Sequence, residues 1–251
     1  IIYFHIIYRG VYMSIIVRRN NLESPVSFLN NANDFNYIDG ILLEVTMTKD
    51  RVIVIYNSTD TPGVTLDRIQ NSNFEDLDKT SVEKLDTILK LLDGWKKMIV
   101  IRISSLLSPI LSDQTLLEYQ EKNSSYINLI NEIIMKYPTL NTSLQSTNTH
   151  LIFYLKRIVK NSPIGLELID ENDNYVDVDY YIFPTTLLDY NVIKQQLNLN
   201  KGVMITIRIS DDLVLLYIFL DKYPELLNDK YRIMFITNYP KLVNELIDSM
   251  K

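Results

Sequence analysis

Cysteine is absent from this sequence of 251 residues, and histidine and tryptophan are scarce, with two copies and one. Without cysteine the chain can hold no disulfide framework, thiolate metal site or cysteine nucleophile. No Gly-x-Gly-x-x-Gly run follows any apolar segment, which argues against a dinucleotide-binding sheet. No Gly/Ser/Pro-rich linker interrupts the chain either. We therefore expect a single domain over residues 1–251.

Basic residues are not concentrated in any one segment. The formal net charge is −6, and the absence of a basic run makes a nucleic-acid partner unexpected. The opening segment IIYFHIIY is too short and too β-branched to span a membrane, and it lacks the basic flank and cleavage site of a secretion signal. These features favour a cytoplasmic protein, although a chain that starts without Met leaves a removed leader open.

Short β-rich runs alternate with helix-length amphipathic segments along the whole chain, and 47% of the residues are hydrophobic. We predict eight strands, at 1–8, 40–47, 97–104, 140–146, 163–169, 178–183, 202–209 and 231–237. Helices are predicted at 23–34, 81–93, 113–137, 148–161, 187–199, 211–223 and 239–250. In the last helix, one apolar stripe contains Leu242, Val243, Leu246, Ile247 and Met250.

Eight alternations of strand and helix are the number that closes a (β/α)8 TIM barrel, and near-continuous apolar strands are typical of a parallel sheet covered by helices. An extra short strand at 52–56 follows the second strand through the turn TKDR. The predicted fold class is therefore α/β, a TIM barrel with one additional strand after strand 2. An open doubly wound sheet is the alternative.

Several motifs recur in the order found in one family. Tyr8-Arg9-Gly10 stands where that family has His-Arg-Gly, and Leu22-Glu23-Ser24 loosely matches Glu-Asn-Thr/Ser. Residues 41–51 match Ile-Glu-Leu-Asp-Val-x-x-Thr-Lys-Asp-Gly, and Ile55-Tyr56-Asn57-Ser58 ends where Val-x-x-His-Asp is expected. Further matches are Ile101–Ser104 to Ile-Glu-Ile-Lys, 143–146 to a Ser-Phe element, 202–210 to Trp-Thr-Val-Asn, and 235–240 to Ile-Thr-Asp-x-Pro. The chain resembles the glycerophosphodiester phosphodiesterases, a TIM-barrel family of phospholipase-C-like phosphodiesterases.

The resemblance implies two histidines as general acid and base, and a calcium or magnesium ion held by carboxylates. Here the histidine positions hold Tyr8 and Asn57, neither of which shuttles protons at neutral pH. The vestigial metal positions hold Leu42, Glu44 and Arg102. One carboxylate is too few for such a cation, so we expect no bound metal or other cofactor.

Arg102 adds a positive charge where a metal ligand is expected, and arginine suits phosphate through its paired donors. We therefore consider a metal-free anion pocket at the carboxyl ends of the strands. Its candidate residues are Tyr8, Arg9, Glu44, Asn57, Arg102, Arg208 and Asn238. The alternative is that Arg102 only pairs with Glu44 to satisfy two buried charges.

The sequence thus predicts a catalytically degenerate member of the family, which binds a phosphate- or glycerophosphodiester-type ligand or a protein partner at the barrel mouth. One alternative is an active phosphodiester hydrolase of lipid metabolism, with Glu44 as base and Arg9 and Arg102 stabilising the transition state. Another is a pure interaction scaffold. The remaining features receive structural interpretations: His5 and His150 match no catalytic position, the strand tyrosines serve packing, 63–79 is a shortened surface loop, and the acidic run 170–179 is a solvated loop.

Overall fold

The computed structural model describes residues 14–18, 26–29, 38–56, 65–106, 113–170, 175–227 and 233–250. The strands are β1 Ser14–Arg18, β2 Gly40–Met47, β3 Ile53–Tyr56, β4 Glu83–Lys84, β5 Met98–Ile103, β6 Asn141–Ser146, β7 Ile164–Glu167, β8 Tyr180–Pro184, β9 Gly202–Ile207 and β10 Ile233–Thr237. The α-helices are α2 Leu66–Asn71, α3 Leu85–Leu91, α4 Asp113–Met135, α5 Thr149–Ile158, α6 Tyr190–Asn198, α7 Ser210–Lys222 and α8 Pro240–Ser249. Short 3-10 helices occupy Phe74–Asp76, Thr185–Leu187 and Pro224–Leu227, and residues 26–29 are also helical.

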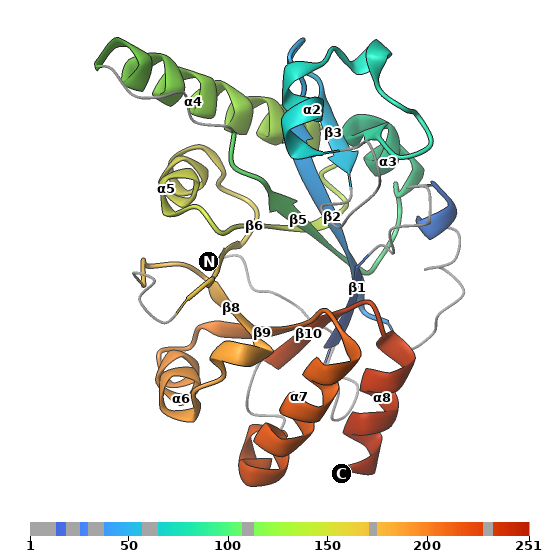
Figure 1. The fold of residues 1–251 in the computed structure, drawn as a ribbon, viewed down its shortest axis with the longest axis vertical. Coiled ribbons are helices and arrows are strands. Elements are labelled where there is room, and N and C mark those ends of the chain that lie inside the picture. The colour runs from blue at the N-terminus through green and yellow to red at the C-terminus, as the bar shows by residue number, and fades with distance from the viewer. Residues whose placement is uncertain are drawn as a thin grey trace.

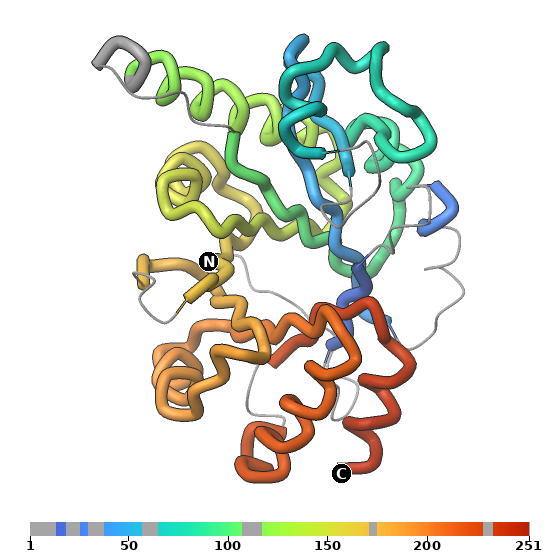
Figure 2. The backbone as a smooth tube through the Cα atoms, viewed as in Figure 1, coloured from blue at the N-terminus to red at the C-terminus, as the bar shows by residue number. Residues whose placement is uncertain are grey.

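Eight parallel strands form a closed ring in the order β1-β10-β9-β8-β7-β6-β5-β2, and pairing of β1 with β2 closes it. β3 pairs antiparallel with β2 outside the ring, and the two-residue β4 pairs antiparallel with β3. Helices surround the strands (Figure 1), and the backbone trace in Figure 2 follows the same alternation from the blue to the red end. The structure is a (β/α)8 TIM barrel, as predicted.

The first barrel strand lies at a different place in the sequence from the one predicted. The segment 1–8 lies outside the described residues, and the place of the first strand in the ring belongs to β1, Ser14–Arg18, which pairs with both β10 and β2. Loop length explains the choice, because connections from strand to helix usually span two to six residues. A strand ending at residue 8 would leave a much longer connection to the helical residues 26–29.

Alternating side chains of the strands build two hydrophobic layers. Inside the ring, one cluster is formed by Ile16, Leu42, Val100, Tyr180, Ile182, Met204 and Ile236. The intervening residues, such as Ile41, Leu43 and Val45 of β2, pack outward against the helices. Each fully buried side chain of this kind contributes about 1.5–3 kcal/mol relative to exposure. The barrel interior is therefore packed at its middle, and any ligand site lies at an end.

The segment predicted as a surface loop at 63–79 is instead structured from residue 65 onward. It contains α2 and the 3-10 helix Phe74–Asp76, and these pack on β3. The small core of this satellite consists of Val54, Tyr56, Ile69, Phe74, Leu77 and Val82. The prediction was wrong because Ile69, Phe74 and Leu77 are widely spaced, so no single periodicity marks them as buried.

Two aspartates accept hydrogen bonds from the backbone at the amino ends of barrel strands, at the end of the barrel opposite the mouth. Asp39 Oδ2 accepts a hydrogen bond from the Ile15 N–H at 2.9 Å, and Asp179 Oδ2 accepts one from the Ile164 N–H at 2.8 Å. Burial raises the pKa of Asp39, and the bond from Ile15 partly offsets this. In the acidic run 170–179, residues 171–174 lie outside the described residues. Asp177 and Asp179 are both exposed, and Asp179 bonds to the start of β7, whereas Asp177 pairs with Lys156 and Lys201.

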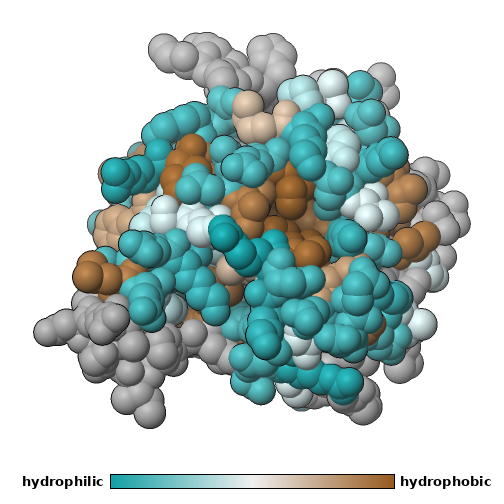
Figure 3. Space-filling model, turned by 90° about the horizontal axis from the view of Figure 1, so that it is seen from above, coloured by the Kyte–Doolittle hydropathy of each residue, from teal (hydrophilic) through white to brown (hydrophobic). Residues whose placement is uncertain are grey.

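One face of the molecule is mainly polar in its described residues (Figure 3). Figure 3 shows hydrophilic residues over most of one face, around a smaller hydrophobic area. α8 follows the predicted stripe with one exception: Val243 and Ile247 are buried, but Leu242 is exposed. His150 is exposed at the start of α5, where its backbone N–H donates a hydrogen bond to the Asn148 side chain. His5 lies outside the described residues. No helix in the described ranges combines the length and hydrophobicity needed to cross a membrane.

Candidate functional site

Glu44 lies inside the barrel near the carboxyl end of β2, two residues beyond Leu42 of the apolar layer. Its Oε1 atom accepts hydrogen bonds from two guanidinium groups. Arg18 Nη2, at the end of β1, is 2.7 Å away, and Arg102 Nη1, on the neighbouring β5, is 3.1 Å away. The barrel register places Arg102 beside Glu44, which makes this pairing local to two adjacent strands.

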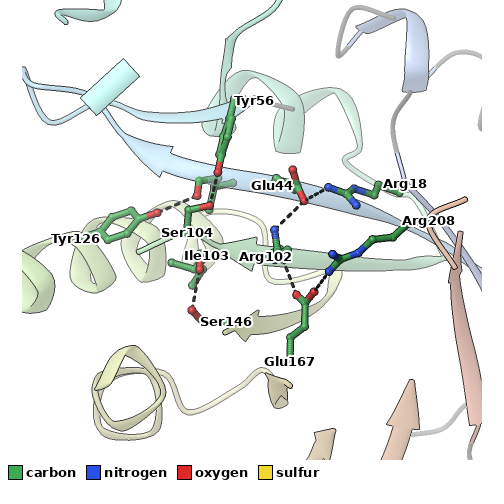
Figure 4. Close-up of polar contacts among 11 residues, drawn as sticks. Arg18, Glu44, Tyr56, Arg102, Ile103, Ser104, Tyr126, Ser146, Glu167 and Arg208 are labelled. Carbon is green, nitrogen blue, oxygen red and sulfur yellow. Dashed lines mark hydrogen bonds and ion pairs between the residues drawn. The ribbon is translucent and has the colours of Figure 1, made fainter. Parts of the chain in front are cut away.

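Glu167, at the end of β7, extends this chain of contacts. Its Oε2 accepts from Arg102 Nε at 2.6 Å, and its Oε1 accepts from Arg208 Nη2 at 2.7 Å. Arg208 is the residue after β9. The five side chains from five strand ends form one connected Arg–Glu network, which Figure 4 shows: Arg18, Glu44, Arg102, Glu167 and Arg208.

The Arg–Glu network contains more arginines than glutamates, and its side chains differ in how far they are exposed to solvent. Among the residues that the structure describes, three guanidinium groups of the network face two carboxylates, a balance of one positive charge. The side chains of Glu44 and Glu167 are 3% and 4% exposed, whereas that of Arg208 is 47% exposed. Burial alone would lower the pKa of Arg102, but the carboxylates of Glu167 and Glu44 outweigh it and raise that pKa. The network is thus permanently charged, and Arg208 is its most accessible cation.

Asp212 fixes the backbone that carries Arg208. Its Oδ2 accepts hydrogen bonds from the N–H groups of Arg208 at 2.6 Å and Ile209 at 3.1 Å. Its Oδ1 accepts a hydrogen bond from the Thr185 hydroxyl, which comes from the segment after β8. Asp212 is in the first turn of α7, where a negative charge also complements the helix dipole. The position of Arg208 is therefore set by two neighbouring loops.

Two amide side chains near the mouth have an unused acceptor. Gln145 sits beside Arg102 in the β5–β6 register and is 1% exposed. Within the part of the chain that the structure describes, its Oε1 has no hydrogen-bond partner, and the same holds for Oδ1 of Asn238, just after β10. A buried amide oxygen without a partner costs about 1–3 kcal/mol. A hydroxyl or water donor at this end of the barrel would remove that cost.

A second set of polar contacts braces the strand ends from outside the ring. Tyr126 of α4 donates to the Val45 carbonyl at 3.0 Å, and Ser146 donates to the Ile103 carbonyl at 2.8 Å. The Tyr56 hydroxyl shares a hydrogen bond with Ser104, directly after β5 (Figure 4). Burial raises the pKa of Tyr56, with a smaller contribution from Glu44. Tyr56 is therefore a neutral structural group near the Arg–Glu network.

The structure brings together three of the residues selected from the sequence: Glu44, Arg102 and Arg208. The predicted pairing of Arg102 with Glu44 is present, but Arg102 contacts Glu167 as well. Leu42 is part of the apolar layer below the mouth. Tyr8, Arg9 and Asn57 lie outside the described residues.

Sequence reasoning missed Arg18 and Glu167. Arg18 was overlooked because the first strand was placed at 1–8, and the loop-length argument that favours Ser14–Arg18 also identifies Arg18 as a strand-end residue. Glu167 stands in the run PIGLELI, where a single acid interrupts an otherwise apolar strand. Buried carboxylates almost always have a partner, so this acid was the available signal.

The residues at the mouth do not fit a divalent cation. Both carboxylates of the Arg–Glu network already contact guanidinium groups, and a cation placed at either would lie against those positive charges. Calcium and magnesium need several oxygen ligands in one place. Among the described residues, no three or more His, Cys, Asp or Glu side chains gather in a metal-binding group.

Comparisons with known proteins agree on the fold. No protein-family model matches the sequence, and no curated protein matches it. Among solved structures, the chain is similar to a phosphodiesterase from Oleispira antarctica in complex with the product sn-glycerol-3-phosphate. The TM-score is 0.69 at 15% identity, over 94% of this chain and 96% of that one. It is also similar to glycerophosphodiester phosphodiesterases from Parabacteroides distasonis, with a TM-score of 0.67, and Thermotoga maritima, with 0.64. Both are 15% identical over 94% of this chain and 98% of the other.

These similarities extend over nearly the whole chain, while the identity is too low to carry residue roles across. The resemblance found in the sequence motifs is matched by the arrangement of the strands and helices. The chain therefore has the TIM-barrel fold of the glycerophosphodiester phosphodiesterases.

Proposed function

We propose that this protein binds a phosphate-ester anion at the carboxyl-end mouth of its barrel and does not hydrolyse it by a metal-assisted acid-base mechanism. The observation that carries the proposal is the exposed guanidinium of Arg208, which belongs to a network with one net positive charge. Arginine forms paired, charge-assisted hydrogen bonds with phosphate oxygens.

The remaining polar groups near the mouth suit the organic part of such a ligand. Among the described residues, the buried oxygens Gln145 Oε1 and Asn238 Oδ1 have no hydrogen-bond partner, and a glycerol hydroxyl or a water that reached them would donate to them. The similar phosphodiesterase from Oleispira antarctica holds sn-glycerol-3-phosphate, and this makes the same compound a rational first probe here.

Hydrolysis is disfavoured by the chemistry of the described mouth residues. Glu44 accepts hydrogen bonds from two guanidinium groups, and a carboxylate so engaged is a weak proton acceptor. Arginine does not exchange protons at neutral pH. The alternative of Glu44 as a general base would require this pairing to be broken first.

One observation favours a scaffold as the second candidate function. Both carboxylates of the Arg–Glu network are paired with arginines of the chain itself, so no ligand is needed to satisfy these buried charges. If the protein is a scaffold, replacing Arg208 should affect anion binding no more than replacing any other surface arginine.

Calorimetric titration with sn-glycerol-3-phosphate tests the binding. We expect saturable binding that weakens as salt is added, and Arg208→Gln should raise the dissociation constant about ten- to hundredfold. Arg157→Gln, at an exposed position on α5, is the matched control and should leave binding unchanged. Absence of binding, or equal loss in both variants, would favour the scaffold.

A separate assay follows hydrolysis of sn-glycero-3-phosphocholine by phosphorus NMR, with calcium, with magnesium and with neither. We expect no turnover beyond the buffer control. Metal-dependent turnover that disappears in Glu44→Gln would replace the proposed binding function with that of an active hydrolase.

A further inference from the structure

α7 is unusual among the outer helices because it is apolar on its exposed side as well as on its buried side. Leu216 and Leu220 are fully buried against the barrel. Val214, Leu215, Tyr217 and Ile218 face solvent, with Leu215 43% and Ile218 58% exposed. The helix lies on the outside of the ring, orange in the lower part of Figure 1.

The neighbouring outer helix α8 shows what an ordinary solvent-facing side looks like in this molecule. It exposes Lys241, Glu245 and Asp248, and one large apolar residue, Leu242. Isolated apolar residues at a surface are common, but a contiguous apolar patch marks an interaction site. Four exposed apolar residues within five positions of α7 are such a patch.

The charged residues of α7 indicate which partner binds to its exposed apolar side. Asp211, Leu215, Ile218 and Lys222 follow one another at intervals of four, three and four residues, so they lie along one stripe of the helix. All four are exposed. The stripe therefore has an acidic end, an apolar centre and a basic end.

Such a stripe is complementary to itself when two copies meet in antiparallel orientation. A two-fold axis through the centre of the stripe sets Asp211 of each copy against Lys222 of the other, and Leu215 of each against Ile218 of the other. A parallel arrangement would instead oppose like charges at both ends. The order of charges along the stripe thus favours a second copy of the chain in the antiparallel orientation.

We propose that this face, the α7 stripe, is the contact between two copies of the chain in an antiparallel, two-fold symmetric dimer. None of the four stripe residues belongs to the Arg–Glu network, so association can be measured without a ligand at the mouth. A single helix pair buries less than the roughly 1,200–2,000 Å² of a stable interface. We therefore expect reversible association with a micromolar dissociation constant.

Sedimentation equilibrium of the full chain over a wide concentration range is the measurement. Wild-type protein should change from monomer to dimer as its concentration rises. Ile218→Asp should raise the dimer dissociation constant at least about a hundredfold, because it places two carboxylates at the apolar centre. Leu242→Asp introduces the same charge at an exposed apolar residue of α8 and should leave association unchanged.

Charge reversal tests the orientation. Asp211→Lys alone opposes like charges at both ends and should weaken the dimer about tenfold, since exposed ion pairs are individually weak. Adding Lys222→Asp to the same chain restores opposite charges and should restore association. Circular dichroism of each variant verifies that it is folded.

Protein that stays monomeric at all concentrations would refute the proposal, as would a dimer unaffected by Ile218→Asp. A double charge reversal that fails to recover association would refute the antiparallel arrangement.

Discussion

The mouth of the barrel and the layer directly beneath it are built from the same strands with opposite chemistry. In β1, β2 and β5, the residues Ile16, Leu42 and Val100 belong to the apolar layer. Two residues further along each strand stand Arg18, Glu44 and Arg102. A shift of two positions keeps a side chain inside the ring and moves it about 6–7 Å along the strand.

The difference between the two layers indicates which inward-facing positions of the barrel tolerate a charged side chain. Charged groups are accepted at the last inward position because each has an oppositely charged partner from another strand. One layer deeper, only apolar side chains occupy these three strands. Breaking a pair at the mouth should therefore cost more than removing the same charge from the outside of the molecule.

The largest effect is expected from Arg102→Met, which removes the guanidinium that links both buried glutamates. Two carboxylates would lose their shared partner, and the free energy of unfolding should fall by about 3–5 kcal/mol. Urea denaturation followed by circular dichroism measures it. Arg157→Met on α5 is the exposed control, with an expected change within about 0.5 kcal/mol. Similar losses in the two variants would show that burial at the mouth does not matter.

A smaller effect is expected from Val100→Thr in the apolar layer. The new hydroxyl has nearly the shape of the methyl group it replaces, but it would face Ile16, Leu42 and their apolar neighbours. The expected loss is about 1–3 kcal/mol, by the same denaturation measurement. Val26→Thr, at a residue that is 41% exposed, is the control and should be nearly neutral. If Val100→Thr left stability unchanged, polar groups would be accepted below the mouth as well.

The smallest effect is expected at Asp177, an exposed carboxylate paired with Lys156 at 2.8 Å and Lys201 at 2.6 Å. Hydrogen bonds from these lysines lower the pKa of Asp177 from 3.8 to about 2. Because the folded pKa is below the unfolded one, the stabilisation is present above pH 3.8 and is lost as the pH falls toward 2.

Asp177→Asn should therefore cost less than about 1 kcal/mol at neutral pH, with the difference from wild type shrinking in that acidic range. Denaturation curves recorded at several pH values test this. A loss as large as that of Arg102→Met would contradict the contrast between exposed and buried pairs.

Several elements were predictable because their signals are local. The alternation of strands and helices identified the barrel, and most predicted ranges coincide with β2, β5–β10 and α3–α8 within a few residues. Arg102 was selected because it stands in Ile101–Ser104, where the resembled family has a metal-ligating glutamate. Its contact with Glu44 was one of two alternatives, proposed because two buried charges need partners, and the register of β2 and β5 places the two residues side by side.

Other features had no local signal. The apolar run at 1–8 was a more obvious strand than SIIVR, and the closure of the ring through β1 gives the first position to Ser14–Arg18. The contact of Glu167 with Arg102 joins residues 65 positions apart across strands that are not neighbours in the ring. No pattern in either strand specifies that meeting.

The sequence by itself determined the class of fold, because hydrophobic periodicity is a property of the chain, and the loss of the expected catalytic groups is a prediction from residue identity. The tertiary structure alone decided which charges meet. Closing eight strands into a ring brings their carboxyl ends together, and each arginine or glutamate there finds its partner according to register and strand order, neither of which is written in any one segment.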